Sequence, residues 1–175
     1  MLEAALMASG ISSERSDSFE QVLRERQRRV LRTAYRILGN WADAEDVAQE
    51  VFLRLHRRGL RFSNDAALGA WIYRVTVNLC IDRSRTAKPA TEVPDAASAD
   101  ASVEIVLIRE QQKERLMTAL SALPVRERAA LVLREIEELP TAAVAAALGT
   151  TEGTVRSQVA KAIAKLRLML SRREL

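Results

Sequence analysis

Apolar residues recur at the three- and four-residue spacing of amphipathic helices along most of this chain. The first such run covers residues 18–38, and Ser18 with Gln21 predicts a capping box at its start. Gly39 and Asn40 predict its end. Arginines share the opposite face of this helix, which we interpret as a solvent-facing side. These arginines are Arg24, Arg28, Arg32 and Arg36.

Two further helices are predicted in the same half of the chain. Residues 42–58, ending at Gly59, and residues 66–85 both carry an apolar stripe, and residues 60–65 between them predict a loop. The residues before the first helix, 1–17, lack sustained periodicity and predict a loose extension. Helix 42–58 has acids in its first turns and arginines in its last, which matches the helix dipole. Local stabilisation therefore explains these charges without any partner.

The periodic pattern breaks at residues 87–102, where Ala, Pro, Ser, Thr and Asp dominate. Such a composition predicts a flexible linker. Helical spacing resumes at Val103, and Pro124 fits the first turn of another helix. The predicted fold class is therefore all-α, with two small helical domains, 18–86 and 103–175, joined by this linker.

The segment 139–159 predicts a helix-turn-helix. Gly149 can adopt the positive φ of a tight turn between helices, and Thr151 is a favourable N-cap for the second helix. The residues expected to lock the two helices together are Val144, Leu148, Val155 and Val159. The side chains expected on the outer face of the second helix are Thr151, Glu152, Thr154, Arg156, Ser157, Gln158 and Lys161. Arg, Gln and Ser suit phosphates and base edges, so the pattern favours duplex DNA binding over a plain alanine-rich hairpin.

Charge and composition agree with an anionic partner for this segment. The chain has a net charge of +4, and residues 151–175 hold six Lys or Arg against two Asp or Glu. Cys80 and His56 are the only residues of their types, which excludes an intrachain disulfide and the usual zinc sites. We expect no metal, no cofactor and a solvated His56. The sequence shows neither a long apolar run nor a signal pattern, so we expect a cytoplasmic protein without membrane insertion.

Two separated blocks of the sequence resemble an extracytoplasmic-function (ECF, group IV) sigma factor, the promoter-recognition subunit of bacterial RNA polymerase. The first block contains Tyr35-Arg36-Ile37-Leu38-Gly39-Asn40, Asp43-Ala44-Glu45-Asp46-Val47-Ala48-Gln49-Glu50-Val51-Phe52-Leu53 and Ala70-Trp71-Ile72-Tyr73-Arg74-Val75. The second contains Ala119-Leu120-Ser121-Ala122-Leu123-Pro124 and the helix-turn-helix. The resemblance implies a region 2-like domain at 18–86, a region 4-like domain at 103–175 and a protein that is not an enzyme. It also implies binding to core RNA polymerase and promoter-specific initiation.

The same resemblance implies three sets of binding residues. Docking on a coiled coil of the largest polymerase subunit is implied for Asp43, Glu45, Asp46, Gln49, Glu50, Phe52 and Leu53. Capture of the melted −10 element is implied for Phe62, Ser63, Asn64, Trp71, Arg74, Asn78, Asp82 and Arg85. The last five are spaced to share one helical stripe, although Trp71 could equally belong to the core. The helix-turn-helix would read the −35 element as duplex, and its domain would touch the flap of the second-largest subunit. An anti-sigma factor is a further implied partner.

Some residues depart from the family pattern and leave the −35 sequence open. Val77 and Gln158 stand where basic residues are common, Lys161 stands where arginine is common, and Ala143 stands near an acidic position. Three other functions compete with the sigma factor. A helix-turn-helix regulator would bind duplex DNA without joining polymerase, and an adaptor would sequester polymerase without initiating. A recombinase-like enzyme would need a convergent catalytic set, which the serines here do not form.

Overall fold

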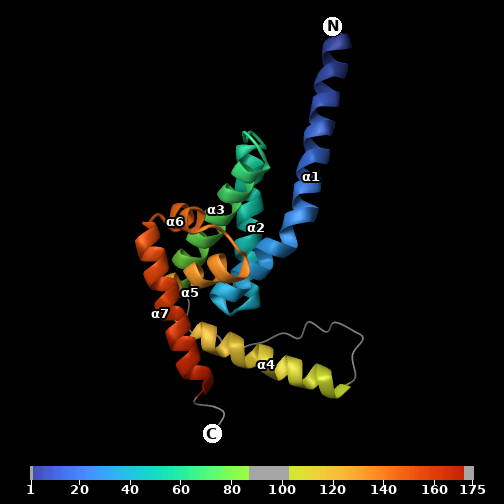
Figure 1. Cartoon of the computed structure of the whole chain (residues 1–175). Helices are drawn as coiled ribbons and strands as arrows, with labels where there is room; N and C mark the ends of the chain where they lie inside the picture. The colour runs from blue at the N-terminus through green and yellow to red at the C-terminus, as the bar shows by residue number, and fades with distance from the viewer. Residues whose placement is uncertain (1, 87–102, 172–175) are drawn as a thin grey trace.

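The computed structural model describes residues 2–86 and 103–171, with side chains for 19–85 and 111–171. Within these ranges every regular element is a helix, which confirms the all-α fold class (Figure 1). The N-terminal half holds α1 (Leu2–Leu38), α2 (Trp41–Arg58) and α3 (Asp65–Thr86). The C-terminal half holds α4 (Val103–Ser121), α5 (Val125–Leu131), the π-helix η1 (Val132–Ile136), α6 (Thr141–Leu148) and α7 (Glu152–Ser171). None of the described helices is both long and apolar enough to cross a lipid bilayer.

The predicted start of the first helix was wrong. Helix α1 begins at Leu2, so residues 2–17 continue the helix and do not form a loose extension (Figure 1). Instead of capping a helix, Gln21 donates a hydrogen bond of 2.9 Å to Glu25 one turn later. Ala, Leu, Met and Glu favour a helix through intrinsic propensity alone, which needs no amphipathic pattern. The predicted linker, 87–102, lies outside the described residues.

Helices α1, α2 and α3 pack against one another around an apolar core. The side chain of Asn40 caps α2 by accepting a hydrogen bond of 3.2 Å from the backbone N–H of Asp43. The bounds of α2 and α3 confirm the predicted second and third helices to within one residue at each end. Burial raises the pKa of the Cys80 thiol to about 12. The largest buried side chains of this core include Ile37, Val51, Leu55 and Val77.

The predicted helix-turn-helix is confirmed as α6 and α7. Gly149 ends α6 with a φ of +61°, a left-handed conformation that a residue without a Cβ adopts at little cost. The Thr151 hydroxyl caps α7 by accepting a hydrogen bond of 3.2 Å from the N–H of Thr154. The four residues predicted to lock the helices are all buried, namely Val144, Leu148, Val155 and Val159.

The π-helix η1 leads into the helix-turn-helix through an unusual backbone. The N–H of Glu137 donates to the carbonyl of Val132 at 2.9 Å, and the N–H of Leu139 donates to the carbonyl of Leu133 at 3.0 Å. Glu138 has a φ of +56° and is the one non-glycine residue with a positive φ among those described. This conformation costs an L-residue about 1–2 kcal/mol. The backbone is strained at the point where the chain turns from η1 toward α6.

The two halves of the described structure pack directly against each other. Helix α6 lies against α3, and α5 and η1 contact α1. The Arg128 guanidinium donates across this boundary to the Ile37 carbonyl at 2.6 Å, and within its own half to the Ser121 and Leu123 carbonyls. Arg36, predicted to face solvent, instead donates to the buried Glu137 at 3.2 Å. That prediction was wrong because helical periodicity identifies a polar face but not the polar partner that covers it.

The strain at Glu138 predicts that glycine is the better residue there. We expect Glu138→Gly to raise the free energy of unfolding by about 0.5–1 kcal/mol, because glycine adopts a positive φ without the Cβ clash. The control is Ala146→Gly in the exposed part of α6, which should lower it by about 1 kcal/mol. Urea unfolding followed by circular dichroism measures both. A loss of stability in Glu138→Gly would contradict the strain.

Candidate nucleic-acid interface and docking groove

The outer face of α7 carries the predicted DNA-reading side chains. Most of them are exposed, namely Thr151, Glu152, Thr154, Arg156, Ser157 and Lys161. Thr151 serves mainly as the N-cap, and its hydroxyl lies 2.9 Å from that of Thr154. Arg156 binds Glu152 at 3.0 Å on the same helix face, where solvent screens the pair. The helix therefore offers hydroxyls and cations to a ligand at a rigid, capped helix end.

Gln158 differs from its neighbours on α7 because it is half-buried. Its side-chain oxygen is enclosed and accepts no hydrogen bond from any residue that the structure describes. An enclosed polar atom without a partner costs free energy, and an outward turn toward water or a ligand would relieve that cost. In this conformation Gln158 is less accessible to a base edge than Lys161, which is exposed one turn later.

The predicted stripe on α3 forms a continuous exposed face. Arg74, Asn78, Asp82 and Arg85 are exposed, and Asp82 lies 3.8 Å from Arg85. At the start of this stripe Trp71 is half-buried. Cation, amide and carboxylate groups thus line one side of a single helix, beside a partly exposed aromatic ring.

A cluster of an arginine and two aromatic rings adjoins this stripe. The ring centroids of Phe62 and Trp71 lie 5.8 Å apart. The Arg58 guanidinium lies 4.9 Å from the Phe62 ring centroid and 5.7 Å from that of Trp71. We call Arg58, Phe62 and Trp71 the aromatic cluster. Sequence reasoning missed Arg58, which looked like a favourable charge at the end of α2. The sequence carried no helical signal for this contact, because α2 ends at Arg58 and Phe62 lies in the loop that follows.

Asn64 and Ser63 occupy the loop between α2 and α3. The Asn64 side-chain oxygen accepts a hydrogen bond of 2.8 Å from the N–H of Ala67 and so caps α3. Ser63 is exposed. Because its oxygen is committed to the cap, Asn64 positions the loop, and only its amide nitrogen stays available to a ligand.

Two acids predicted to bind a partner through α2 are bound within the molecule. Arg83 of α3 donates to Asp43 at 2.7 Å and to Asp46 at 2.5 Å. The hydrogen bond to Asp43 is the main cause of a raised pKa at Arg83. This arginine therefore clamps α3 to α2 and neutralises part of the acidic surface.

The other two acids of α2 have partners on the same helix. The Trp41 ring nitrogen donates to Glu45 at 2.9 Å, and Arg54 donates to Glu50 at 2.7 Å. Local stabilisation thus accounts for both acids, as it does for Asp43 and Asp46. Any partner of α2 has to compete with these contacts or use other side chains.

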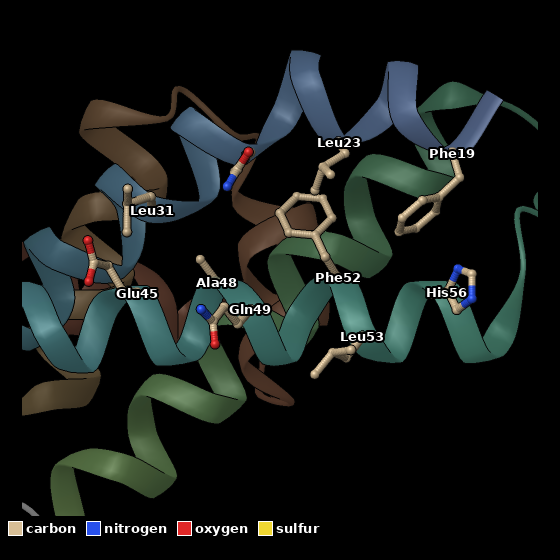
Figure 2. A pocket seen from close by; sticks show the side chains of 10 residues that line it. Phe19, Leu23, Leu31, Glu45, Ala48, Gln49, Phe52, Leu53 and His56 are labelled. Atoms are coloured by element: carbon tan, nitrogen blue, oxygen red, sulfur yellow. The ribbon is translucent and has the colours of Figure 1, made fainter. Parts of the chain in front are cut away.

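An apolar groove of about 590 Å³ runs along the boundary between α1 and α2 (Figure 2). Phe52 points from α2 toward α1 and is buried, so it forms part of the floor and is not an exposed contact. Leu53 is 50% exposed, and it lies at the groove with the exposed Gln49. His56 is exposed at one end, with its ring 5.1 Å from that of Phe19.

Comparison with known proteins matches both halves of the chain. The family model for Sigma-70 region 2 matches residues 22–89, and that for Sigma-70, region 4 matches residues 113–166. ECF RNA polymerase sigma factor SigM of Mycobacterium tuberculosis (strain ATCC 25618 / H37Rv) is 35% identical over 173 residues, which cover 96% of this chain and 84% of SigM. The RNA polymerase sigma-E factor of Streptomyces avermitilis is 34% identical, covering 90% of this chain and 87% of that factor. The chain belongs to the ECF sigma factors.

Membership of this family gives the function of the chain in outline. A sigma factor binds core RNA polymerase and directs promoter-specific transcription initiation, so the alternative of a regulator that works apart from polymerase is not favoured. The membership implies a regulator of transcription and not an enzyme. The resemblance found in the sequence is confirmed.

Two solved structures share the fold of this sigma factor. CnrH, in complex with the cytosolic domain of CnrY, has a TM-score of 0.69 at 21% identity and covers 95% of this chain and 96% of its own. RpoE of Bartonella quintana, in complex with the anti-sigma factor NepR, has a TM-score of 0.70 at 19% identity and covers 88% of this chain and 97% of its own.

Proposed function

We propose that three surfaces of this sigma factor carry out polymerase binding and promoter recognition. The groove between α1 and α2 docks on core polymerase, the stripe of α3 with the aromatic cluster holds the melted −10 strand, and α7 reads the −35 duplex. The observation that carries this proposal is that both DNA-reading faces are exposed and polar, while the exposed apolar surface of α2 lies at the groove. The domains 18–86 and 103–175 and the linker 87–102 are part of this proposal.

Docking on the largest-subunit coiled coil centres on Leu53 and Gln49. The acids of α2 all have partners within the chain, so their contribution to a complex is reduced by the contacts they would give up. Leu53 has no such cost, because burying an exposed leucine releases water from apolar surface. An apolar contact in a groove with a polar rim has the composition of a protein–protein interface core.

We expect Leu53→Asp to weaken binding to core polymerase by at least about tenfold, because a carboxylate would be buried against an apolar surface. Leu116→Asp is the matched control, since Leu116 of α4 is also a large exposed apolar residue, at 42% against 50% for Leu53. Binding to core is measured by fluorescence anisotropy, and run-off transcription from a promoter library measures initiation. Equal binding by the two variants would remove the groove from the docking surface. If the wild-type protein bound core polymerase but initiated at no promoter of the library, the result would favour the polymerase-sequestering adaptor.

Single-strand capture at the −10 element centres on the aromatic cluster. Stacking of a base on an aromatic ring contributes about 1–3 kcal/mol and tolerates any base sequence. The half-buried Trp71 and Phe62 provide ring edges and faces, and Arg58 adds a guanidinium that attracts phosphate and stacks on rings. The exposed Asn78 and Arg74 on the adjoining stripe supply groups for hydrogen bonding to a flipped base.

We expect Arg58→Ala to weaken binding of a single-stranded −10 oligonucleotide to holoenzyme by about three- to tenfold. This is the range for losing a cation–π contact between the guanidinium and a DNA base. Arg57→Ala is the matched control, because it removes the same charge from an exposed neighbour for which no ring contact is found among the described residues. Arg58→Lys should lie between them, since it keeps the charge and loses the planar group. Equal effects of Arg58→Ala and Arg57→Ala would reduce Arg58 to a general electrostatic contribution.

Duplex reading at the −35 element centres on Arg156 and Lys161 of α7. Both are exposed on the outer face of a helix whose first turn is capped. Arginine suits bidentate contact with guanine, and lysine suits phosphate. The remaining predicted residues lie on the same face, with Gln158 half-buried in this conformation.

We expect Arg156→Ala and Lys161→Ala each to weaken −35 duplex binding, and a lost phosphate contact to lower the slope of log K against log salt by about 0.9. Lys165→Ala is the control within α7, because Lys165 is bound to Glu127 of α5 at 2.7 Å. Fluorescence anisotropy over a salt series measures the slopes. Unchanged binding in Arg156→Ala and Lys161→Ala would remove the assignment of α7 as the recognition helix.

Further partners follow from the same assignment. The C-terminal half would also touch the flap of the second-largest subunit, and an anti-sigma factor would bind across both halves. The structures of CnrH with CnrY and of RpoE with NepR are complexes of this kind and support the second partner. The cytoplasm, where RNA polymerase works, is the proposed compartment.

A further inference from the structure

Gln158 lies on the polar face of α7 between Thr154 and Lys161. These three residues are spaced four and three apart, so they share one helical stripe. Thr154 and Lys161 are exposed, whereas Gln158 is half-buried with its side-chain oxygen enclosed. Neither end of the Gln158 amide makes a hydrogen bond with any residue that the structure describes. A side chain with one acceptor and two donor hydrogens therefore stays unpaired within the described part of the molecule.

An enclosed oxygen without a partner needs an explanation, since nearly all buried polar groups in folded proteins are paired. The other such atom among the described residues is Nε of Arg128. The remaining guanidinium nitrogens of Arg128 donate to the carbonyls of Ile37, Ser121 and Leu123, so that side chain has a structural role. No contact with a described residue gives the Gln158 amide such a role. Its place on a DNA-reading helix indicates a partner outside the chain.

An outward turn breaks no hydrogen bond of Gln158, which distinguishes it from other polar residues of α7. Arg156 binds Glu152 at 3.0 Å and has to leave it to reach a base. The Thr151 hydroxyl caps the helix and lies 2.9 Å from the hydroxyl of Thr154. For Gln158, the inward conformation keeps the methylene groups packed and leaves the oxygen unpaired. The outward conformation gives up that packing, and its oxygen gains a donor from water or DNA.

The chemistry of a glutamine amide selects adenine in the major groove. Its oxygen accepts from the N6 amino group of adenine while its nitrogen donates to N7. Guanine presents the acceptor O6 in place of that amino group, so the amide oxygen would face another acceptor. The hydroxyls of Thr154 and Ser157 suit several bases, and Lys161 suits phosphate. Gln158 is therefore the group on this stripe whose chemistry distinguishes adenine from guanine.

We propose that Gln158 turns outward on the −35 duplex and selects adenine at one position of that element. The inference rests on the proposed role of α7 and adds to it the residue and the base that it reads. A well-placed bidentate pair discriminates by about 5- to 100-fold against the wrong base. Arginine at the same place would select guanine, because its two donors match O6 and N7.

The test is the selection of sequences by holoenzyme from promoter DNA randomised across the −35 element. We expect wild type to prefer adenine over guanine by at least about fivefold at one position. Gln158→Met keeps the length of the side chain without its amide, so this ratio should fall to about one. Gln158→Arg should reverse the ratio in favour of guanine. The preferences at all other positions should stay those of wild type.

Lys161→Met is the matched control, because it brings the same new residue to the exposed neighbour one turn later. It should weaken binding to the whole pool and keep the adenine preference, since a phosphate contact carries no sequence information. Urea unfolding gives a second readout. Gln158→Met should raise the midpoint by about 0.3 M, because it removes an unpaired enclosed oxygen, whereas Lys161→Met should leave the midpoint unchanged. A lower midpoint in Gln158→Met would contradict the unpaired amide on which the inference depends.

An adenine preference that persists in Gln158→Met would overturn the inference. Loss of preference at every position in that variant would also overturn it, because Gln158 would then hold the helix in shape without reading a base. In both cases α7 remains the reading helix if wild type selects a −35 sequence and Lys161→Met binds more weakly. Absence of any base preference in wild type, together with unchanged binding of Lys161→Met, would instead contradict the proposed role of α7 itself.

Discussion

Burial of the Glu137 carboxylate is the constraint on which the arrangement of this sigma factor depends. A charge at 4% exposure is tolerated only when donors surround it, and four side chains from α1 and α3 provide them. These donors can converge only if η1 meets α1 at one register. The wide turns of the π-helix and the strained Glu138 bring Glu137 to that place. This contact, the Arg128–Ile37 hydrogen bond and the packing of α6 on α3 together fix the relative position of the two halves.

Local features of the fold could be predicted because they follow from local rules. Gly149, Thr151 and the buried valines of the helix-turn-helix are fixed by turn geometry, capping and periodicity within some twenty residues of sequence. The hydrogen bonds that Glu137 accepts from Arg29 and Tyr73 could not be predicted in this way, because these partners lie 108 and 64 positions away in the sequence. Arg36 on an amphipathic helix has the same pattern whether water or a carboxylate faces it. Long-range polar pairing leaves no periodic signal in a single sequence.

In the candidate site, too, the residue types on a helix face could be predicted from the sequence, whereas the contacts of single side chains could not. The stripe from Trp71 to Arg85 was predictable, since helical spacing alone puts these side chains on one face. The separate roles of Asn64 and Arg58 were not predictable. Asn64 has the chemistry to read a base, and only the structure shows that its oxygen caps α3. Arg58 has the chemistry of a helix-end charge, and only the structure shows the aromatic rings beside it.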